Sequence, residues 1–108
     1  MTLSDIIHKI TEEFMERHLG DTPQEINSGN CDHFADVVQR LAKKQGILTS
    51  WAEGYGHFWI FYNGKHYDAE APEGVENWHL LPFYIRNKPL TVEGATWYDE
   101  VQSMEEDL

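Results

Sequence analysis

The feature that most constrains the fold is the dipeptide Asn63-Gly64, which stands between two short runs of aromatic and β-branched residues. Asn-Gly in this setting indicates a two-residue hairpin turn, because both residues adopt the positive φ angles that the turn requires. The dipeptide therefore predicts antiparallel strands over residues 58–62 and 65–69. Because side chains alternate between the two faces of a strand, the turn also decides which residues share a face of the sheet.

The predicted register brings a histidine and two carboxylates to one face of this hairpin. Counting back from the turn pairs Tyr62 with Lys65, Phe61 with His66, Ile60 with Tyr67, Trp59 with Asp68 and His57 with Glu70. Asp68 is then the diagonal neighbour of His57, and Glu70 lies directly opposite it, so both carboxylates are within side-chain reach. A carboxylate that holds one tautomer of an imidazole is what an activated nucleophile requires. The alternative to a catalytic role is an ordinary histidine–aspartate pair on the surface of a half-exposed sheet.

Two amphipathic helices are expected before the hairpin. Apolar residues at three- and four-residue intervals predict helices over residues 4–19, with Ser4 as N-cap, and over residues 31–45, with Asn30 as N-cap. The residues between them are dense in turn formers, so a loop is expected over 20–30. Further strands are expected over 47–54, 78–85 and 91–98.

Helices followed by strands predict an α+β fold in which N-terminal helices pack on an antiparallel β-sheet. The 108-residue chain has the size of one domain, residues 1–108, and the stretch from about Asp99 is expected to be an acidic tail. The first residues contain no secretory signal, and no run of about 18 apolar residues indicates a membrane span, so a cytoplasmic protein is expected.

Charge excludes several classes of partner. The formal net charge of −11 repels phosphate backbones and anionic lipids, so neither nucleic acid nor a membrane is expected as a partner. A basic protein partner is compatible with such an acidic surface. The single cysteine excludes an internal disulfide framework and a thiolate-rich zinc site.

That cysteine, Cys31, stands in the first turn of the second predicted helix. Unpaired backbone N–H groups at this position carry partial positive charge, which favours the thiolate, and the thiolate is the nucleophilic form. The preceding Gly29 lets a substrate approach the backbone closely. The alternative is a structural thiol, because Cys31 also lies on the apolar stripe of the helix and free cysteine is commonly buried.

Together these residues resemble the transglutaminase-like, papain-like superfamily of cysteine enzymes, its small phage and bacterial members in particular. The resemblance covers residues 24–71 and rests on Gly29-Asn30-Cys31-Asp32-His33-Phe34-Ala35, Gly46-Ile47, Gly54-Tyr55, Gly56-His57-Phe58-Trp59-Ile60 and Gly64-Lys65-His66-Tyr67-Asp68. The intervals between the cysteine, the histidine and the aspartate are shorter than in large members. Loops that build a substrate cleft in those members are therefore missing.

The resemblance implies a papain-like core and a catalytic triad. Cys31 would be the nucleophile, His57 the general base and later the acid, and Asp68 the carboxylate that orients the imidazole. The backbone N–H of Cys31 would be one oxyanion donor. Gln24 or Asn27 is the candidate for the second.

Two main functions follow from this reading. The first is a small cysteine-dependent acyl-transfer enzyme that acts on a protein or peptide and needs no cofactor, either a peptidase- or amidase-like hydrolase or a transglutaminase. The second is a non-catalytic acidic interaction or inhibitor protein on the same fold. A zinc site built from Cys31, His57, His66 and Asp68 is a further alternative, because the residue types suit that metal.

Overall fold

The computed structural model describes residues 1–54, 56–87 and 95–96. Its elements follow in the order α1 (Leu3–Glu16), α2 (Pro23–Gly29), α3 (Cys31–Lys44), β1 (Ser50–Gly54), β2 (His57–Tyr62), β3 (Lys65–Asp68), β4 (Ala71–Val75), the 3₁₀ turn η1 (Trp78–Leu80), α4 (Pro82–Arg86) and β5 (Ala95–Thr96). The α+β class predicted from the sequence is confirmed.

The strands form one antiparallel sheet in the order β4-β3-β2-β1-β5. The predicted hairpin joins β2 to β3: Asn63 and Gly64 have φ angles of 50° and 80°. The register is also as predicted next to the turn, with Tyr62 paired with Lys65 and then Phe61 with His66 and Ile60 with Tyr67. Side chains of β2 therefore alternate between two buried faces.

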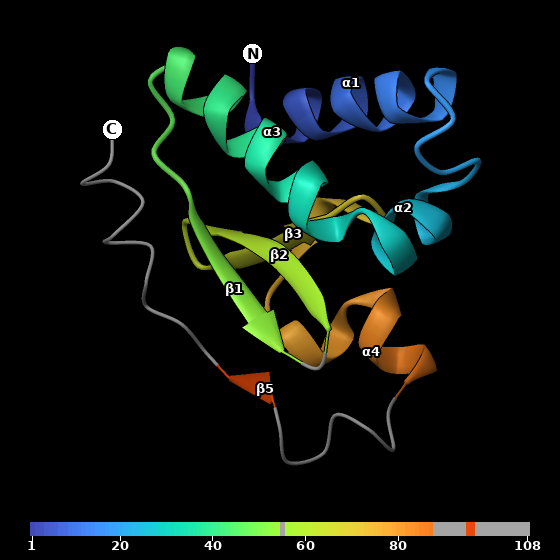
Figure 1. Ribbon diagram of the computed structural model, residues 1–108. Helices are drawn as coiled ribbons and strands as arrows, with labels where there is room; N and C mark the ends of the chain where they lie inside the picture. The colour runs from blue at the N-terminus through green and yellow to red at the C-terminus, as the bar shows by residue number, and fades with distance from the viewer. Residues whose placement is uncertain (55, 88–94, 97–108) are drawn as a thin grey trace.

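Each face of the sheet has its own helical cover (Figure 1). Helices α1, α2 and α3 lie over one face and enclose a core with Ile60 and Tyr67. The opposite face carries Ala52 and Trp59, and η1 and α4 cover it through Leu81 and Tyr84. His57 projects from the same face of β2 as Trp59, so it lies in this second core.

The two long helices form for the predicted reason, with small differences at their ends. The apolar stripe of α1 is buried and comprises Leu3, Ile6, Ile7, Ile10 and Phe14. Thr2, not Ser4, is the N-cap: its hydroxyl accepts from Asp5 N–H, and the Asp5 carboxylate accepts from Thr2 N–H, a reciprocal capping box. The helix also ends before the predicted residue 19, because His18 has a φ of 59°.

Asn30 occupies the predicted N-cap position of α3, but its side chain does not cap the helix. Its Nδ2 donates instead to the Leu19 carbonyl at 2.6 Å. This bond ties the segment after α1 to the residue before Cys31. It thereby helps to hold the start of α3 in place.

The loop expected over residues 20–30 is wrong, because most of it is helix α2. The Thr22 hydroxyl accepts from Glu25 N–H at 3.2 Å, and Pro23 occupies the first helical turn, where its missing N–H has no intrahelical partner to lose. The signal was present in the sequence as Thr22-Pro23-Gln24-Glu25. The surrounding turn formers outweighed it.

The strand expected over 78–85 is also wrong. Asn77 Oδ1 accepts from His79 N–H at 2.9 Å and starts η1, and Pro82 occupies the first turn of α4. These local bonds favour helical turns. Helical spacing also lets Leu81 and Tyr84 both face Trp59 in the second core.

The sequence did not predict β4, which Ala71–Val75 form by pairing with β3. Of the strand expected over 91–98, residues 95–96 form β5 beside β1, and the rest lies outside the described residues. The predicted acidic tail lies outside them as well. None of the helices in the described ranges is long and apolar enough to cross a membrane.

Gly74 in β4 provides a test of this packing. It has a φ of +82°, and a Cβ built there would lie 2.8 Å from the Tyr67 ring. We expect Gly74→Ala to lower the free energy of unfolding by about 2–4 kcal/mol, from backbone strain and overpacking together. Gly46→Ala is the matched control, because Gly46 has a φ of +81° and open space around it. Urea denaturation measures the stability of both variants. Equal losses of stability would show that the contact with Tyr67 contributes nothing.

Candidate active site

The thiol of Cys31 lies at the first residue of α3, beside Gly56, the residue that precedes β2. Its Sγ donates a weak hydrogen bond to the Gly56 carbonyl at 3.7 Å, and the residue is 8 % exposed. The first N–H groups of a helix have no intrahelical acceptor, and they favour negative charge at this end. The predicted location of Cys31 at a helix start is confirmed, and its burial is what the alternative of a structural thiol expected.

His57 and Asp68 form a buried pair behind the thiol. Nε2 of His57 lies 2.9 Å from Oδ2 of Asp68, and the two side chains are 0 % and 1 % exposed. A carboxylate only accepts hydrogen bonds, so Nε2 carries the proton and donates it. His57 is the first residue of β2 and Asp68 the last of β3. The hairpin therefore brings them together at the same end of the sheet.

The Asp68 carboxylate is held on its other side as well. Its Oδ1 accepts from the backbone N–H groups of Glu70 and Ala71, both at 2.9 Å. These bonds form the turn from β3 into β4. Three donors thus fix the carboxylate, which in turn fixes the orientation of the His57 ring.

Glu70, the other carboxylate expected near His57, lies elsewhere. Its oxygens bind Arg86 Nη1 and Nη2 at 2.7 and 2.8 Å, and Asn27 Nδ2 donates to it at 3.2 Å. The extended register that would pair Glu70 with His57 ends because β3 stops at Asp68 and the chain turns. The structure therefore places Asp68, and not Glu70, against the imidazole.

Opposing effects set the pKa of His57. Burial disfavours the charged ring, but the hydrogen bond to Asp68 and the neighbouring Cys31 favour it, and together they raise the pKa above its ordinary value of 6.5. Since Nε2 is taken by Asp68, we infer that Nδ1 is the nitrogen that faces the thiol. Nδ1 is buried and has no hydrogen-bond partner among the described residues, and the thiol bonds Gly56 instead. The thiol and the imidazole are thus neighbours, and Cys31 is one of the groups that raise the pKa of His57.

Helix α4 closes the site from the second face of the sheet. The Phe83 ring stacks on the His57 ring, with centroids 4.4 Å apart and planes 17° apart. The Tyr84 hydroxyl donates to the Gly54 carbonyl, and burial raises the pKa of Tyr84, so the hydroxyl keeps its proton. Neither residue was expected at the site, because the apolar sequence of their segment favours a strand. Only Pro82 indicated a helix start there.

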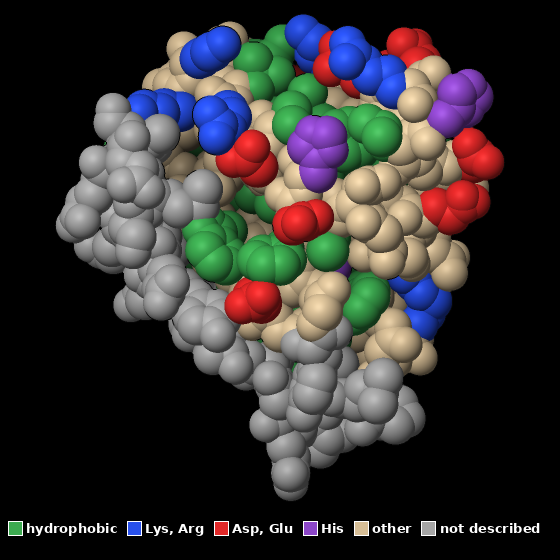
Figure 2. Space-filling view, in the orientation of Figure 1, with side chains coloured by type: hydrophobic (Ala, Val, Ile, Leu, Met, Phe, Trp, Pro, Cys, Tyr) green, Lys and Arg blue, Asp and Glu red, His purple; other side chains and the backbone are tan. Residues whose placement is uncertain are grey.

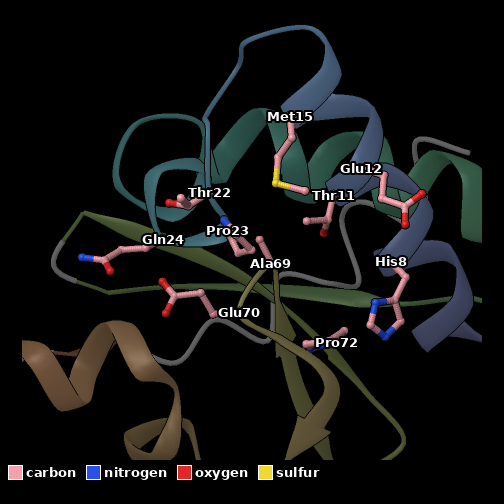
Figure 3. Close-up of a pocket in the computed structure, with 10 residues that line it drawn as sticks. All are labelled: His8, Thr11, Glu12, Met15, Thr22, Pro23, Gln24, Ala69, Glu70 and Pro72. Carbon is pink, nitrogen blue, oxygen red and sulfur yellow. The ribbon is translucent and has the colours of Figure 1, made fainter.

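The two candidate oxyanion donors occupy different environments. Asn27 is buried, and its Nδ2 bonds Glu70 while its Oδ1 has no partner in the described part of the chain. Gln24 is exposed and lines a pocket of about 620 Å³ between α1, α2 and the turn after β3 (Figure 3). Neither Cys31 nor His57 is among the described residues that line that pocket. No hydrogen bond among the described residues joins Gln24 to the thiol.

The structure does not assemble the alternative zinc site. No three His, Cys, Asp or Glu side chains within the described ranges are placed to hold a metal ion together. His66 has another use: Trp59 Nε1 donates to its Nδ1 at 3.0 Å. This bond occupies a nitrogen lone pair that a metal would need.

His66 provides a test of the pH dependence of folding. It is 5 % exposed, and burial lowers its pKa from 6.5 to about 4. Between these pH values the unfolded chain binds the extra proton and the folded chain does not, so stability falls as the pH falls through this window. We expect this residue to lower the free energy of unfolding by roughly 3 kcal/mol between pH 7 and pH 4.

The measurement is urea unfolding of the wild type and of His66→Gln at both pH values. The variant keeps an acceptor for Trp59 but has no group that titrates, so its stability should fall less on acidification. Equal losses in the two proteins would contradict the assigned pKa. The titration of His66 itself can be followed by NMR.

The site thus combines a thiol at a helix N-terminus with an imidazole and a carboxylate that are fixed by hydrogen bonds. In chemical terms, this set can activate a sulfur nucleophile and move its proton. The fold and the site define the class as an α+β domain with a thiol, an imidazole and a carboxylate gathered at one end of its sheet. No family model matches the chain, and no similar protein was found among curated proteins or solved structures.

Proposed function

We propose that the protein is a cysteine-dependent acyl-transfer enzyme, a hydrolase of amide bonds in a peptide or protein. Cys31 is its nucleophile, His57 its general base and acid, and Asp68 the carboxylate that orients the imidazole. The observation that carries this proposal is the buried 2.9 Å bond from His57 Nε2 to Asp68. It fixes the tautomer that leaves Nδ1 as an acceptor beside the only thiol.

The reaction proceeds through a thioester. His57 Nδ1 takes the thiol proton as Sγ of Cys31 attacks the substrate carbonyl carbon. The tetrahedral intermediate collapses, the carbon–nitrogen bond breaks, and the imidazolium gives its proton to the leaving amine. Water then attacks the thioester with His57 as base, which releases the carboxylic acid and restores the thiol. Throughout, the Asp68 carboxylate stabilises the charged ring and stays unprotonated.

The oxyanion is stabilised by the backbone N–H of Cys31 at the start of α3. Gln24 and Asn27 remain the candidates for a second donor. Asn27 has one amide proton beyond the one that bonds Glu70, whereas Gln24 must turn away from its exposed position. Substitution of each by Ala would separate them.

The same observations support a proposed place in the transglutaminase-like, papain-like superfamily. A cysteine opens the helix that packs on the sheet, a histidine starts one strand, and an aspartate ends the return strand. In this proposal the protein is a small cytoplasmic member with a peptide substrate. Because Cys31 is only 8 % exposed, that substrate must reach a largely buried residue.

Alkylation and turnover test this proposal. Iodoacetamide should label Cys31 at pH 6.5 faster than it labels a model thiol, and a panel of peptide amides and thioesters should contain a substrate that the wild type cleaves and Cys31→Ser does not. Mass spectrometry of the quenched reaction should show the acyl group on Cys31. Labelling no faster than the model thiol, with no turnover of any substrate, would refute the proposal.

The second candidate is an acidic interaction protein, which the net charge of −11 favours. A basic partner would then bind the surface with no role for the thiol. This candidate predicts that Cys31→Ser keeps full binding while neutralisation of surface carboxylates abolishes it. The enzyme proposal predicts loss of function in Cys31→Ser.

A further inference from the structure

An apolar hollow lies along α3 on the side toward β1 and β2. It has a volume of about 260 Å³ and is lined by Ala35, Gln39, Trp51, Phe58 and two acids, Asp32 and Asp36. Small-molecule pockets usually measure about 300–1,000 Å³, so this hollow has the size for one side chain. Figure 2 shows hydrophobic surface with acidic side chains around it on this face of the molecule.

The hollow lies on the same helix as the candidate nucleophile, and Asp32 in its wall directly follows Cys31. Cys31, Ala35 and Gln39 are spaced four residues apart and so follow one side of α3. At 1.5 Å per residue, Ala35 lies about 6 Å and Gln39 about 12 Å beyond Cys31 along the helix. A peptide in extended form advances about 3.3 Å per residue, so the residue two positions from the reacting carbonyl would reach the hollow.

The walls suit an aliphatic stem with a cationic end. The Trp51 and Phe58 rings pack with centroids 5.3 Å apart and provide apolar surface and π faces. Asp36 already accepts from Arg40 Nε at 2.9 and 3.0 Å. Asp32 accepts only from the neighbouring His33 N–H and has no cationic partner among the described residues. Glu53 pairs with Phe58 across the strands and adds a third acid on this face.

An unpartnered acceptor at the inner wall also indicates a ligand. Gln39 is 8 % exposed, and its Nε2 donates to the Thr49 carbonyl at 3.3 Å. Its Oε1 is buried and has no hydrogen-bond partner within the described ranges. A buried acceptor without a donor costs free energy, which a hydrogen-bond donor of a bound ligand would recover.

We propose that this hollow binds a lysine or arginine side chain of the substrate, two residues before the reacting carbonyl. The inference rests on the proposed function, because it places the hollow relative to the Cys31 nucleophile. The aliphatic stem lies on Trp51 and Phe58, and the cationic end reaches Asp32. The substrates are therefore basic peptides, which the negative charge of the protein also attracts.

Peptidyl chloromethyl ketones of the form N-acetyl-X-Gly test this assignment, with X as lysine, arginine, norleucine or glutamate. We expect labelling of Cys31 to be at least fivefold faster for lysine or arginine than for norleucine, and slowest for glutamate. Comparison of lysine with arginine shows which cation fits better. Asp32→Asn should lower the lysine-to-norleucine ratio about three- to fivefold, as for one exposed charge pair. Asp32→Lys should reverse the lysine-to-glutamate preference.

Ratios between probes cancel any effect of these substitutions on the thiol itself. Glu16→Gln, which removes one charge from the exposed end of α1, is the control and should leave the ratios unchanged. Equal rates for lysine and norleucine, in a protein whose labelling still depends on His57, would overturn the subsite and leave the proposed function standing. Labelling that is independent of His57 would overturn both the subsite and the proposed function.

Discussion

His57→Ala is expected to lower kcat/KM for the cleaved substrate by about 10²–10⁴-fold, the usual contribution of a positioned acid–base group. In the proposed reaction the ring supplies both proton transfers, from the Cys31 thiol and to the leaving amine. It lies between Cys31 and Asp68, and its pKa is raised above 6.5, so it binds the transferred proton readily. Alanine has no side-chain group that can take up the thiol proton. Steady-state kinetics and the rate of Cys31 alkylation measure the effect.

His33→Ala is the matched control. His33 lies on the same helix as Cys31, but its side chain is exposed and packs beside Phe14, with ring centroids 5.0 Å apart. This substitution should leave kcat/KM within a factor of about two, as expected for a surface change away from the site. Similar losses in the two variants, or none in His57→Ala, would show that the imidazole has no part in the reaction.

Asp68→Ala is expected to have the largest effect on stability, a loss of about 3–5 kcal/mol. The substitution leaves the buried His57 Nε2–H and the N–H groups of Glu70 and Ala71 without their acceptor. It therefore disturbs both the site and the turn into β4. Urea denaturation measures the loss, and the activity of the folded fraction should also fall.

Asp68→Asn separates the two roles of the carboxylate. Asparagine keeps an oxygen for the backbone N–H groups, so stability should fall less than in Asp68→Ala. The neutral amide cannot favour the imidazolium, so kcat/KM should still fall by about 10²-fold or more. A variant with wild-type kcat/KM would show that Asp68 only supports the turn.

The wild type and Asp68→Asn are expected to differ in how their stability depends on pH. Because the folded pKa of His57 is raised, the folded chain binds more protons than the unfolded chain above pH 6.5. The stability from this group is complete below pH 6.5 and is lost as the pH rises through the folded pKa. Asp68→Asn removes the main partner of the ring, so its stability should decline less over that range. NMR titration of His57 should show a lower pKa in the variant.

The prediction from sequence succeeded where local chemistry decides the structure. Asn63-Gly64 can form only a few turns, so it determined the pairing of Phe61 with His66 and thereby the face that His57 and Asp68 share. It failed where local signals were mixed. Thr22-Pro23 started a helix inside an apparent loop, and Pro82 started another inside an apparent strand. In both segments a side-chain cap or a proline outweighed the general composition.

By itself, therefore, the sequence determined the two long helices, the central hairpin and the position of Cys31 at the start of α3, because periodicity, caps and turns act over a few residues. Only the tertiary structure decided that Asp68 and not Glu70 meets His57, since that depends on where β3 ends and on the capture of Glu70 by Arg86. It also brought Phe83 onto the imidazole. Such contacts join residues far apart in the chain, and no local pattern specifies them.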